Sequence, residues 1–125
     1  MMISDPIQLA EIQNFLTEKR SERGIIVSRV SVDYDDCANN RKHYYKVYYG
    51  KITDHDELVR LSIAMRLNYT DFHTFLNLFD VQLNTKYERN RAINDYIKDT
   101  DPIERDVDTL NEILKKSKLK ILSVR

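Results

Sequence analysis

The stretch DHDELVRLSIAMRLNYTDFHTFLNLF, residues 54–79, decides the fold. Its apolar residues recur every three or four positions, which is the spacing of one helix face and not the alternation of a strand. Asp54 and Glu57 have the spacing of a capping box, and Asn68 or Thr70 is suited to begin a second helix. We therefore expect two helices with their apolar faces inward. The predicted core residues are Leu58, Leu61, Ala64, Met65, Leu67, Phe72, Phe75, Leu76 and Phe79.

Helical signals continue on both sides of this stretch. A helix capped by Asp5, with Pro6 in its first turn, is expected to end at Gly24. Thr85 begins a second capping-box pattern, and a last helix is expected to open at Pro102. That last helix carries an apolar stripe, which consists of Ile103, Val107, Leu110 and Leu114.

Composition agrees with a helical, globular protein. The 125 residues suit one domain with one core, and only 2 Gly and 2 Pro disfavour an all-β sandwich, which needs many tight turns. No apolar run approaches the length of a membrane span, and the first residues do not have the pattern of a secretion signal. The lone Cys37 excludes an intramolecular disulfide and fits a reducing compartment. A net charge of zero argues against a strong non-specific polyanion binder.

Residues 25–49 fit two structures. The β-branched and aromatic residues of IIVSRVSVDY (25–34) and HYYKVYY (43–49) favour a β-hairpin across DDCANN (35–40). A helix from Asn40 would instead place Tyr44, Val47 and Tyr48 on one side. Its other side would carry Arg41, Lys42, Tyr45, Lys46 and Tyr49. Helical spacing separates core from solvent better than either strand face does, but the residues alone leave the two structures nearly even.

A resemblance to a known family favours the helix. RKHYYKVYYGK, residues 41–51, resembles the R-x-Y-x-Y-K-I-F-x-G-K pattern of a bacterial subgroup of the XRE, or phage-repressor-like, helix-turn-helix family. FLTEKRSERG (15–24) resembles the family's first helix and closing glycine, and residues 56–97 follow its later helices in order. The resemblance covers about residues 7–98. It implies a mainly α, repressor-like bundle, to which we assign residues 1–100. The segment after Pro102 lies outside the resemblance; we expect residues 101–125 to form a C-terminal helix and a basic tail that pack on the same domain.

The resemblance implies a sequence-specific, DNA-binding transcriptional regulator in the cytoplasm of a bacterium, encoded by it or by a phage. The second helix of such a motif lies in the major groove of double-stranded DNA. Two half-sites would require a dimer, for which the 102–116 helix is the candidate surface; the competing interpretation is that its stripe packs on its own bundle. The candidate DNA-contacting residues are Asn40, Arg41, Lys42, Tyr45, Lys46, Tyr49 and Lys51.

The sequence departs from the family pattern between Gly24 and the second helix. This segment is a few residues longer and contains Asp33, Asp35 and Asp36. Together with zero net charge, these acids favour an alternative function, a helix-turn-helix-derived protein-interaction module such as a phage-encoded inhibitor of a host system.

Nothing in the sequence indicates an enzyme. His43, His55 and His73 are scattered, and the DHD run at 54–56 has no second cluster at metal-ligand spacing. There is no glycine-rich phosphate loop and no nucleophile motif. We therefore expect no catalytic residue, no metal site and no cofactor.

Overall fold

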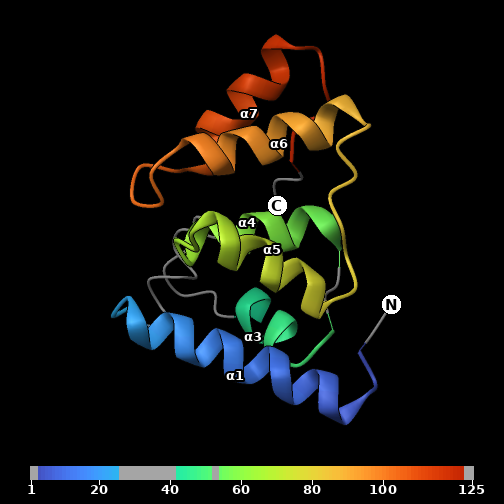
Figure 1. The fold of residues 1–125 in the computed structure, drawn as a ribbon, viewed down its shortest axis with the longest axis vertical. Coiled ribbons are helices and arrows are strands. Elements are labelled where there is room, and N and C mark those ends of the chain that lie inside the picture. The colour runs from blue at the N-terminus through green and yellow to red at the C-terminus, as the bar shows by residue number, and fades with distance from the viewer. Residues whose placement is uncertain (1–2, 26–41, 52–53, 123–125) are drawn as a thin grey trace.

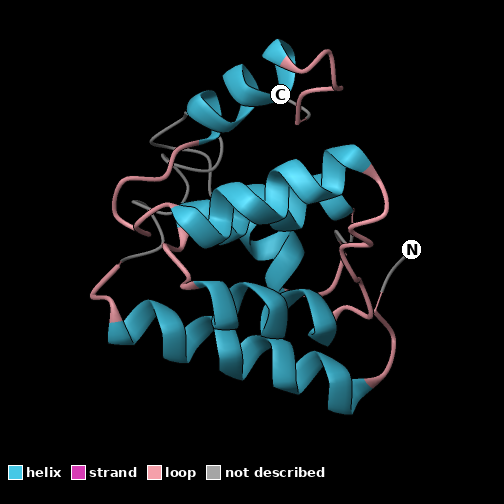
Figure 2. Ribbon diagram, turned by 45° about the horizontal axis from the view of Figure 1, so that its top comes forward, coloured by secondary structure: helices cyan, strands magenta, loops and turns pink. Residues whose placement is uncertain are grey.

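The computed structural model describes residues 3–25, 42–51 and 54–122, and every regular element in these ranges is a helix (Figure 2). The predicted mainly α class is thereby confirmed. The helices are α1 (Pro6–Glu22), α3 (Lys42–Tyr48), α4 (His55–Ala64), α5 (Tyr69–Leu78), α6 (Glu88–Asp99) and α7 (Val107–Lys116).

The helices stack from one end of the molecule to the other in an order close to their order in the chain. In Figure 1, α1 lies along the bottom, α3 lies between it and the α4–α5 pair, and α6 and α7 form the top. Helix α1 packs on both α3 and α5, while α7 packs on α6. The short α3 is thus held against the bundle by a longer helix.

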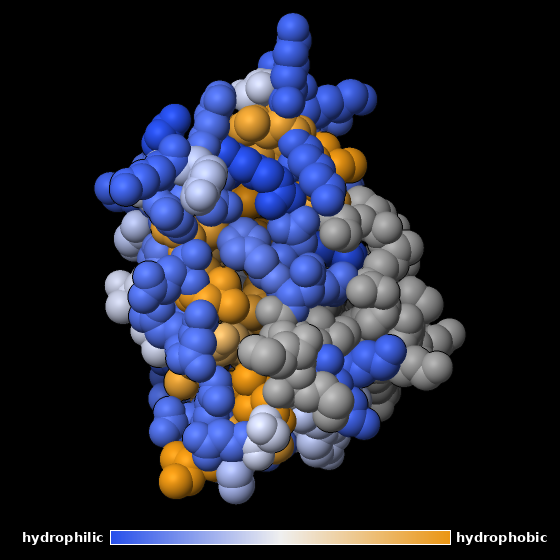
Figure 3. Space-filling model, turned by 90° about the vertical axis from the view of Figure 1, so that its right-hand side faces the viewer, coloured by the Kyte–Doolittle hydropathy of each residue, from blue (hydrophilic) through white to orange (hydrophobic). Residues whose placement is uncertain are grey.

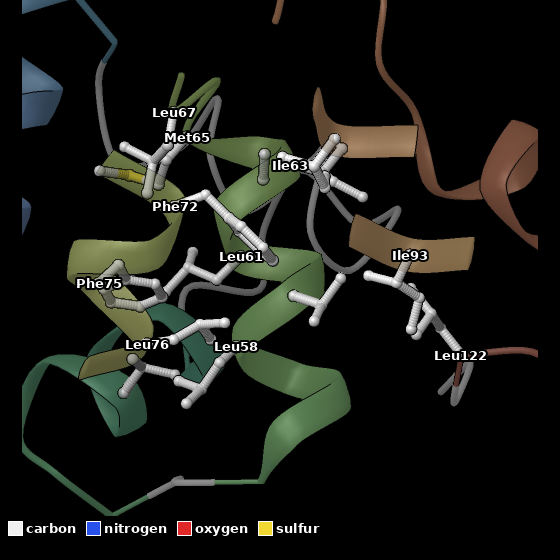
Figure 4. Close-up of a cluster of buried hydrophobic side chains, with 14 of the residues drawn as sticks. Leu58, Leu61, Ile63, Met65, Leu67, Phe72, Phe75, Leu76, Ile93 and Leu122 are labelled. Carbon is white, nitrogen blue, oxygen red and sulfur yellow. The ribbon is translucent and has the colours of Figure 1, made fainter. Parts of the chain in front are cut away.

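Helix α4 is the centre of the core. Eight of its ten residues are buried, because other helices cover it on most sides. Around it lie the apolar faces of its neighbours, including Phe72 and Phe75 of α5 (Figure 4). The same buried cluster includes residues from both ends of the chain, since Leu16 and Leu122 belong to it. All nine core residues predicted from residues 54–79 are buried.

Most of the predicted helix starts are confirmed by their caps. Asp5 accepts a hydrogen bond from the Ile7 amide at 2.9 Å, and Asn68 accepts one from the Asp71 amide at 2.8 Å. Asp54 accepts a longer one, 3.4 Å, from the amide of Glu57. The capping box predicted to begin at Thr85 is wrong. Helix α6 begins at Glu88, and its N-cap residue, Tyr87, makes no capping bond through its side chain.

The last helix begins later than expected. It starts at Val107 and not at Pro102, with Asp106 as its cap, accepting from the amide of Thr109 at 2.7 Å. The preceding residues form a turn in which Asp101 accepts from the amide of Ile103 at 3.0 Å. This turn places the guanidinium of Arg105 inside the protein.

Arg105 donates to three backbone carbonyls in two segments of the chain. Its side chain donates to the carbonyls of Thr100, at 3.1 Å, and Ile97, at 2.5 Å, both near the end of α6. It also donates to the carbonyl of Leu67, in the turn between α4 and α5. Arg105 is only 8% exposed, and burial lowers the pKa of its guanidinium. One side chain therefore satisfies carbonyls that two helix ends leave without partners.

The apolar stripe of the last helix mostly faces the bundle. Leu110 and Leu114 are fully buried, and Val107 packs partly buried against the core. Ile103 lies outside the helix and is 70% exposed. The stripe therefore packs mostly on its own bundle. This agrees with the interpretation that competed with a dimer surface at residues 102–116.

Five of the described helices end in the same hydrogen-bonded turn, a Schellman motif. In each, a residue with positive φ donates its amide to the carbonyl three positions back, and the next residue donates to the carbonyl five positions back. Glycine is the residue usually found at this position, but here it occupies only two of the five. The chain therefore closes these five helices although it contains only 2 glycines. The positive-φ residues are Gly24, Gly50, Arg66, Asp80 and Lys118.

Replacing Lys118 with glycine is expected to raise the free energy of unfolding by about 0.5–1 kcal/mol. Lysine pays a steric penalty at its φ of 58°, whereas glycine does not. Lys118→Ala, which keeps the penalty, is the control for loss of the charge, and Lys115→Gly, inside α7, should lower stability. Urea unfolding measures all three variants; a loss of stability in Lys118→Gly would contradict the explanation.

Candidate nucleic-acid interface

Helix α3 has one buried face and one exposed face. Tyr44 is 1% exposed and Val47 is fully buried, while Tyr48 packs partly buried against the core. Tyr45 and Tyr49 point outward, with 38% and 53% of their surface exposed. This is the division that helical spacing predicts.

The hairpin alternative is wrong for residues 42–48, which are helical; the rest of it, residues 26–41, lies outside the described residues. Strand propensity is overridden here because only a helix places Tyr44 and Val47 together in the core.

The three tyrosines of α3 and Tyr49, which follows it, form a continuous series of ring contacts. Along the helix, Tyr44 and Tyr48 stack with centroids 6.1 Å apart, and Tyr45 and Tyr49 stack at 6.3 Å. Across the helix, Tyr48 meets Tyr45 and Tyr49 edge to face, at 6.2 Å and 5.1 Å. The inner rings thereby support the outer ones. Burial raises the pKa of the Tyr44 hydroxyl, which the nearby Arg20 guanidinium partly offsets.

The C-terminal end of α3 is fixed by residues far away in the chain. Gly50 adopts φ 72° in the closing turn, and its carbonyl accepts from the amide of Ile3 at 2.8 Å. From α1, the side chain of Gln13 donates to the carbonyl of Tyr48 at 3.2 Å. Neither contact could be predicted, because no local pattern links residues 35 or more positions apart.

The predicted DNA-contacting residues divide into three groups. Asn40 and Arg41 lie outside the described residues, and Lys42 is the first residue of α3, with a side chain that is not described. The structure brings the remaining four together at and just after the exposed face of α3. These are Tyr45, Lys46, Tyr49 and Lys51, all exposed.

The described part of this surface is electrostatically positive. Neither Lys46 nor Lys51 forms an ion pair with a described residue, and α3 itself contains no acid. The Schellman turn leaves Lys51 directly beyond the helix end, where its amide donates to the carbonyl of Lys46 at 2.7 Å. Two cations and two phenols are therefore presented together to solvent.

The DHD run has a structural role. Asp56 forms a two-bond ion pair with Arg89 of α6, at 2.8 Å and 3.0 Å, and lies 3.3 Å from a ring nitrogen of His55. Arg89 also donates to the carbonyl of Lys120, at 2.7 Å, and so ties the C-terminal segment to the start of α4. Within the described ranges, no three His, Cys, Asp or Glu side chains gather closely enough to hold a metal.

Stability is expected to fall in acid through Asp56. Burial opposes its ionisation, but the hydrogen bonds from His55 and Arg89 outweigh burial and hold the pKa of Asp56 far below its ordinary 3.8. A depressed carboxyl pKa stabilises the fold above the unfolded-state pKa, and this contribution is lost as the pH falls through the folded-state pKa. Asp56→Asn should therefore be less stable at pH 7, by roughly 2 kcal/mol, and lose less stability from pH ~5 to pH ~2.

Urea unfolding across that pH range tests the role of Asp56. Asp95→Asn, at an exposed position of α6, is the matched control and should follow the parent protein. Parallel pH profiles for the parent and Asp56→Asn would exclude this carboxylate as the source of acid sensitivity.

Comparison of the chain with protein-family models, curated proteins and solved structures finds no match. Among the described residues, no helix has the length and apolar character needed to cross a bilayer.

Proposed function

We propose that this protein is a sequence-specific, DNA-binding transcriptional regulator of the repressor-like class, acting in the cytoplasm of a bacterium and encoded by it or by a phage. One observation supports this most directly. Helix α3 is anchored by Tyr44 and Val47 and turns Tyr45, Lys46 and Tyr49 to solvent.

The dimensions and chemistry of α3 suit a major groove. An α-helix with its side chains is about 10–12 Å across, and the major groove is about 12 Å wide, enough to admit the helix. Lys46 is exposed beside Tyr45 and Tyr49, where its ammonium can donate to guanine N7 and O6 or to a phosphate. Lys51, just beyond the helix, suits a phosphate contact.

A single copy is expected to bind weakly. Phosphate contacts from Lys46 and Lys51 alone correspond to a salt slope of about −1.8, so tight binding at physiological salt requires two copies on two half-sites. A homodimer through residues 102–116 would have to use the side chains that the core leaves outside, Ile103 and Ile113, which are 70% and 38% exposed. On the face drawn in Figure 3, hydrophobic residues form small separate patches among hydrophilic ones.

Lys46→Ala is expected to weaken binding to a selected duplex by about 10- to 100-fold, since a base-edge contact discriminates by about 1–3 kcal/mol. If Lys46 meets a phosphate instead, the salt slope falls by about 1 in magnitude. The duplex is obtained by selection from a random pool, and fluorescence anisotropy at several salt concentrations gives affinity and slope. Lys98→Ala, at an exposed position of α6, is the matched control.

Unchanged affinity and slope in Lys46→Ala would remove α3 from the interface. The protein-interaction alternative makes a different prediction: no duplex is enriched by the selection, while a stable protein complex is recovered from host extract. The two experiments together separate the two functions.

A further inference from the structure

Two of the exposed side chains on and just after α3 are aromatic, Tyr45 and Tyr49. Tyr45 and Tyr49 lie one helical turn apart and stack with an interplanar angle of 27°. Tyr49 rests edge-on against Tyr48, and Tyr45 rests edge-on against Tyr44, at 5.3 Å. Because the inner rings are held in or against the core, the outer pair is pre-organised and loses little conformational freedom on binding.

The described part of this surface has none of the side chains that usually recognise adenine. Adenine is read by Asn or Gln and guanine by Arg or Lys. Among its described outward residues, α3 has no amide and one cation, Lys46. An aromatic ring instead offers apolar contact, and the apolar feature in the major groove is the 5-methyl group of thymine, or of 5-methylcytosine.

We infer that Tyr45 and Tyr49 recognise pyrimidine 5-methyl groups in the major groove. The inference rests on the proposed function and specifies which feature of the DNA is read. The ring centroids are 6.3 Å apart, and base pairs are about 3.4 Å apart, so the two methyl groups lie about two base-pair steps apart when α3 runs along the groove. The phenol hydroxyls remain available to donate to phosphate oxygens.

Deoxyuridine tests this inference, because it differs from thymidine only by the 5-methyl group. Each thymidine of the selected duplex is replaced by deoxyuridine, one position at a time, and affinity is measured by anisotropy. We expect a loss of about fourfold at each of one or two positions and no change elsewhere, from the transfer free energy of one methyl group. At a deoxycytidine that stands in such a position, 5-methyldeoxycytidine should raise affinity by a similar factor.

Variants assign each position to a ring. Tyr45→Ser and Tyr49→Ser should each remove the thymidine–deoxyuridine difference at one position. Tyr45→Phe and Tyr49→Phe should keep it, since the ring and not the hydroxyl meets the methyl group. Both positions are exposed, and circular dichroism verifies that each variant is folded.

The outcomes distinguish this inference from the proposed function. Selective duplex binding with no deoxyuridine effect at any position overturns the methyl readout and leaves the regulator standing. A deoxyuridine effect that persists unchanged in both serine variants also overturns it. Absence of any selective duplex binding overturns both.

Discussion

Replacing Arg105 with methionine is expected to lower the free energy of unfolding by roughly 3–5 kcal/mol. Methionine fills much of the same space but leaves the carbonyls of Leu67, Ile97 and Thr100 without the donor they share. Each buried acceptor left without a partner costs roughly 1–3 kcal/mol, and relaxation or water recovers part of the sum. Few single substitutions in a chain of this size have so large an effect.

Arg105→Lys separates charge from geometry. Lysine keeps the positive charge but is a compact donor that cannot span three carbonyls, two at the end of α6 and one in the turn between α4 and α5. We therefore expect it to recover less than half of the loss. Urea unfolding measures both variants, and a loss below about 1 kcal/mol in Arg105→Met would show that the three hydrogen bonds contribute little.

Gly50→Ala is the second large effect, with an expected loss of about 2–4 kcal/mol. An alanine Cβ would lie 2.7 Å from the Cβ of Ile3 and 3.2 Å from Cδ1 of Leu9, in addition to the penalty at φ 72°. The N-terminal segment or the end of α3 must move to make room. If α3 meets DNA as proposed, the affinity for the selected duplex falls together with stability.

Gly24→Ala is the matched control for the backbone penalty. Gly24 has a similar φ of 63° and also closes a helix, but an added Cβ would meet no atom within 4 Å. It should lose only about 1–2 kcal/mol, and the difference between the two alanine variants gives the contribution of close packing at Gly50. If urea unfolding shows the same loss of stability for both variants, the N-terminal segment moves to accommodate the added Cβ at no measurable cost.

The parts of the fold that sequence predicts are those whose determinants are local. Asp54 and Asn68 cap helices through bonds to residues three positions away, and the spacing of Phe72, Phe75 and Leu76 specifies the buried face of α5. Such signals are contained in a few consecutive residues.

The missed features depend on distant partners. The late start of α7 follows from Arg105 turning inward to Leu67, 38 positions earlier in the chain. Helix α3 depends on both local and distant residues. Its local sequence favours a strand, and the burial of Tyr44 against the bundle favours the helix that forms. Its outward residues were predicted from helical spacing, whereas its support from Gln13 has no signature in the sequence.

The hydrogen bond between Ile3 and Gly50 has a practical consequence for anyone handling the protein. Whatever is attached ahead of Ile3 emerges beside the turn that closes α3. A bulky affinity tag there would crowd the surface proposed to meet DNA. The resulting loss of binding would then come from the tag and not from the protein. A small fluorophore at the same place would sit close enough to report when that surface becomes occupied.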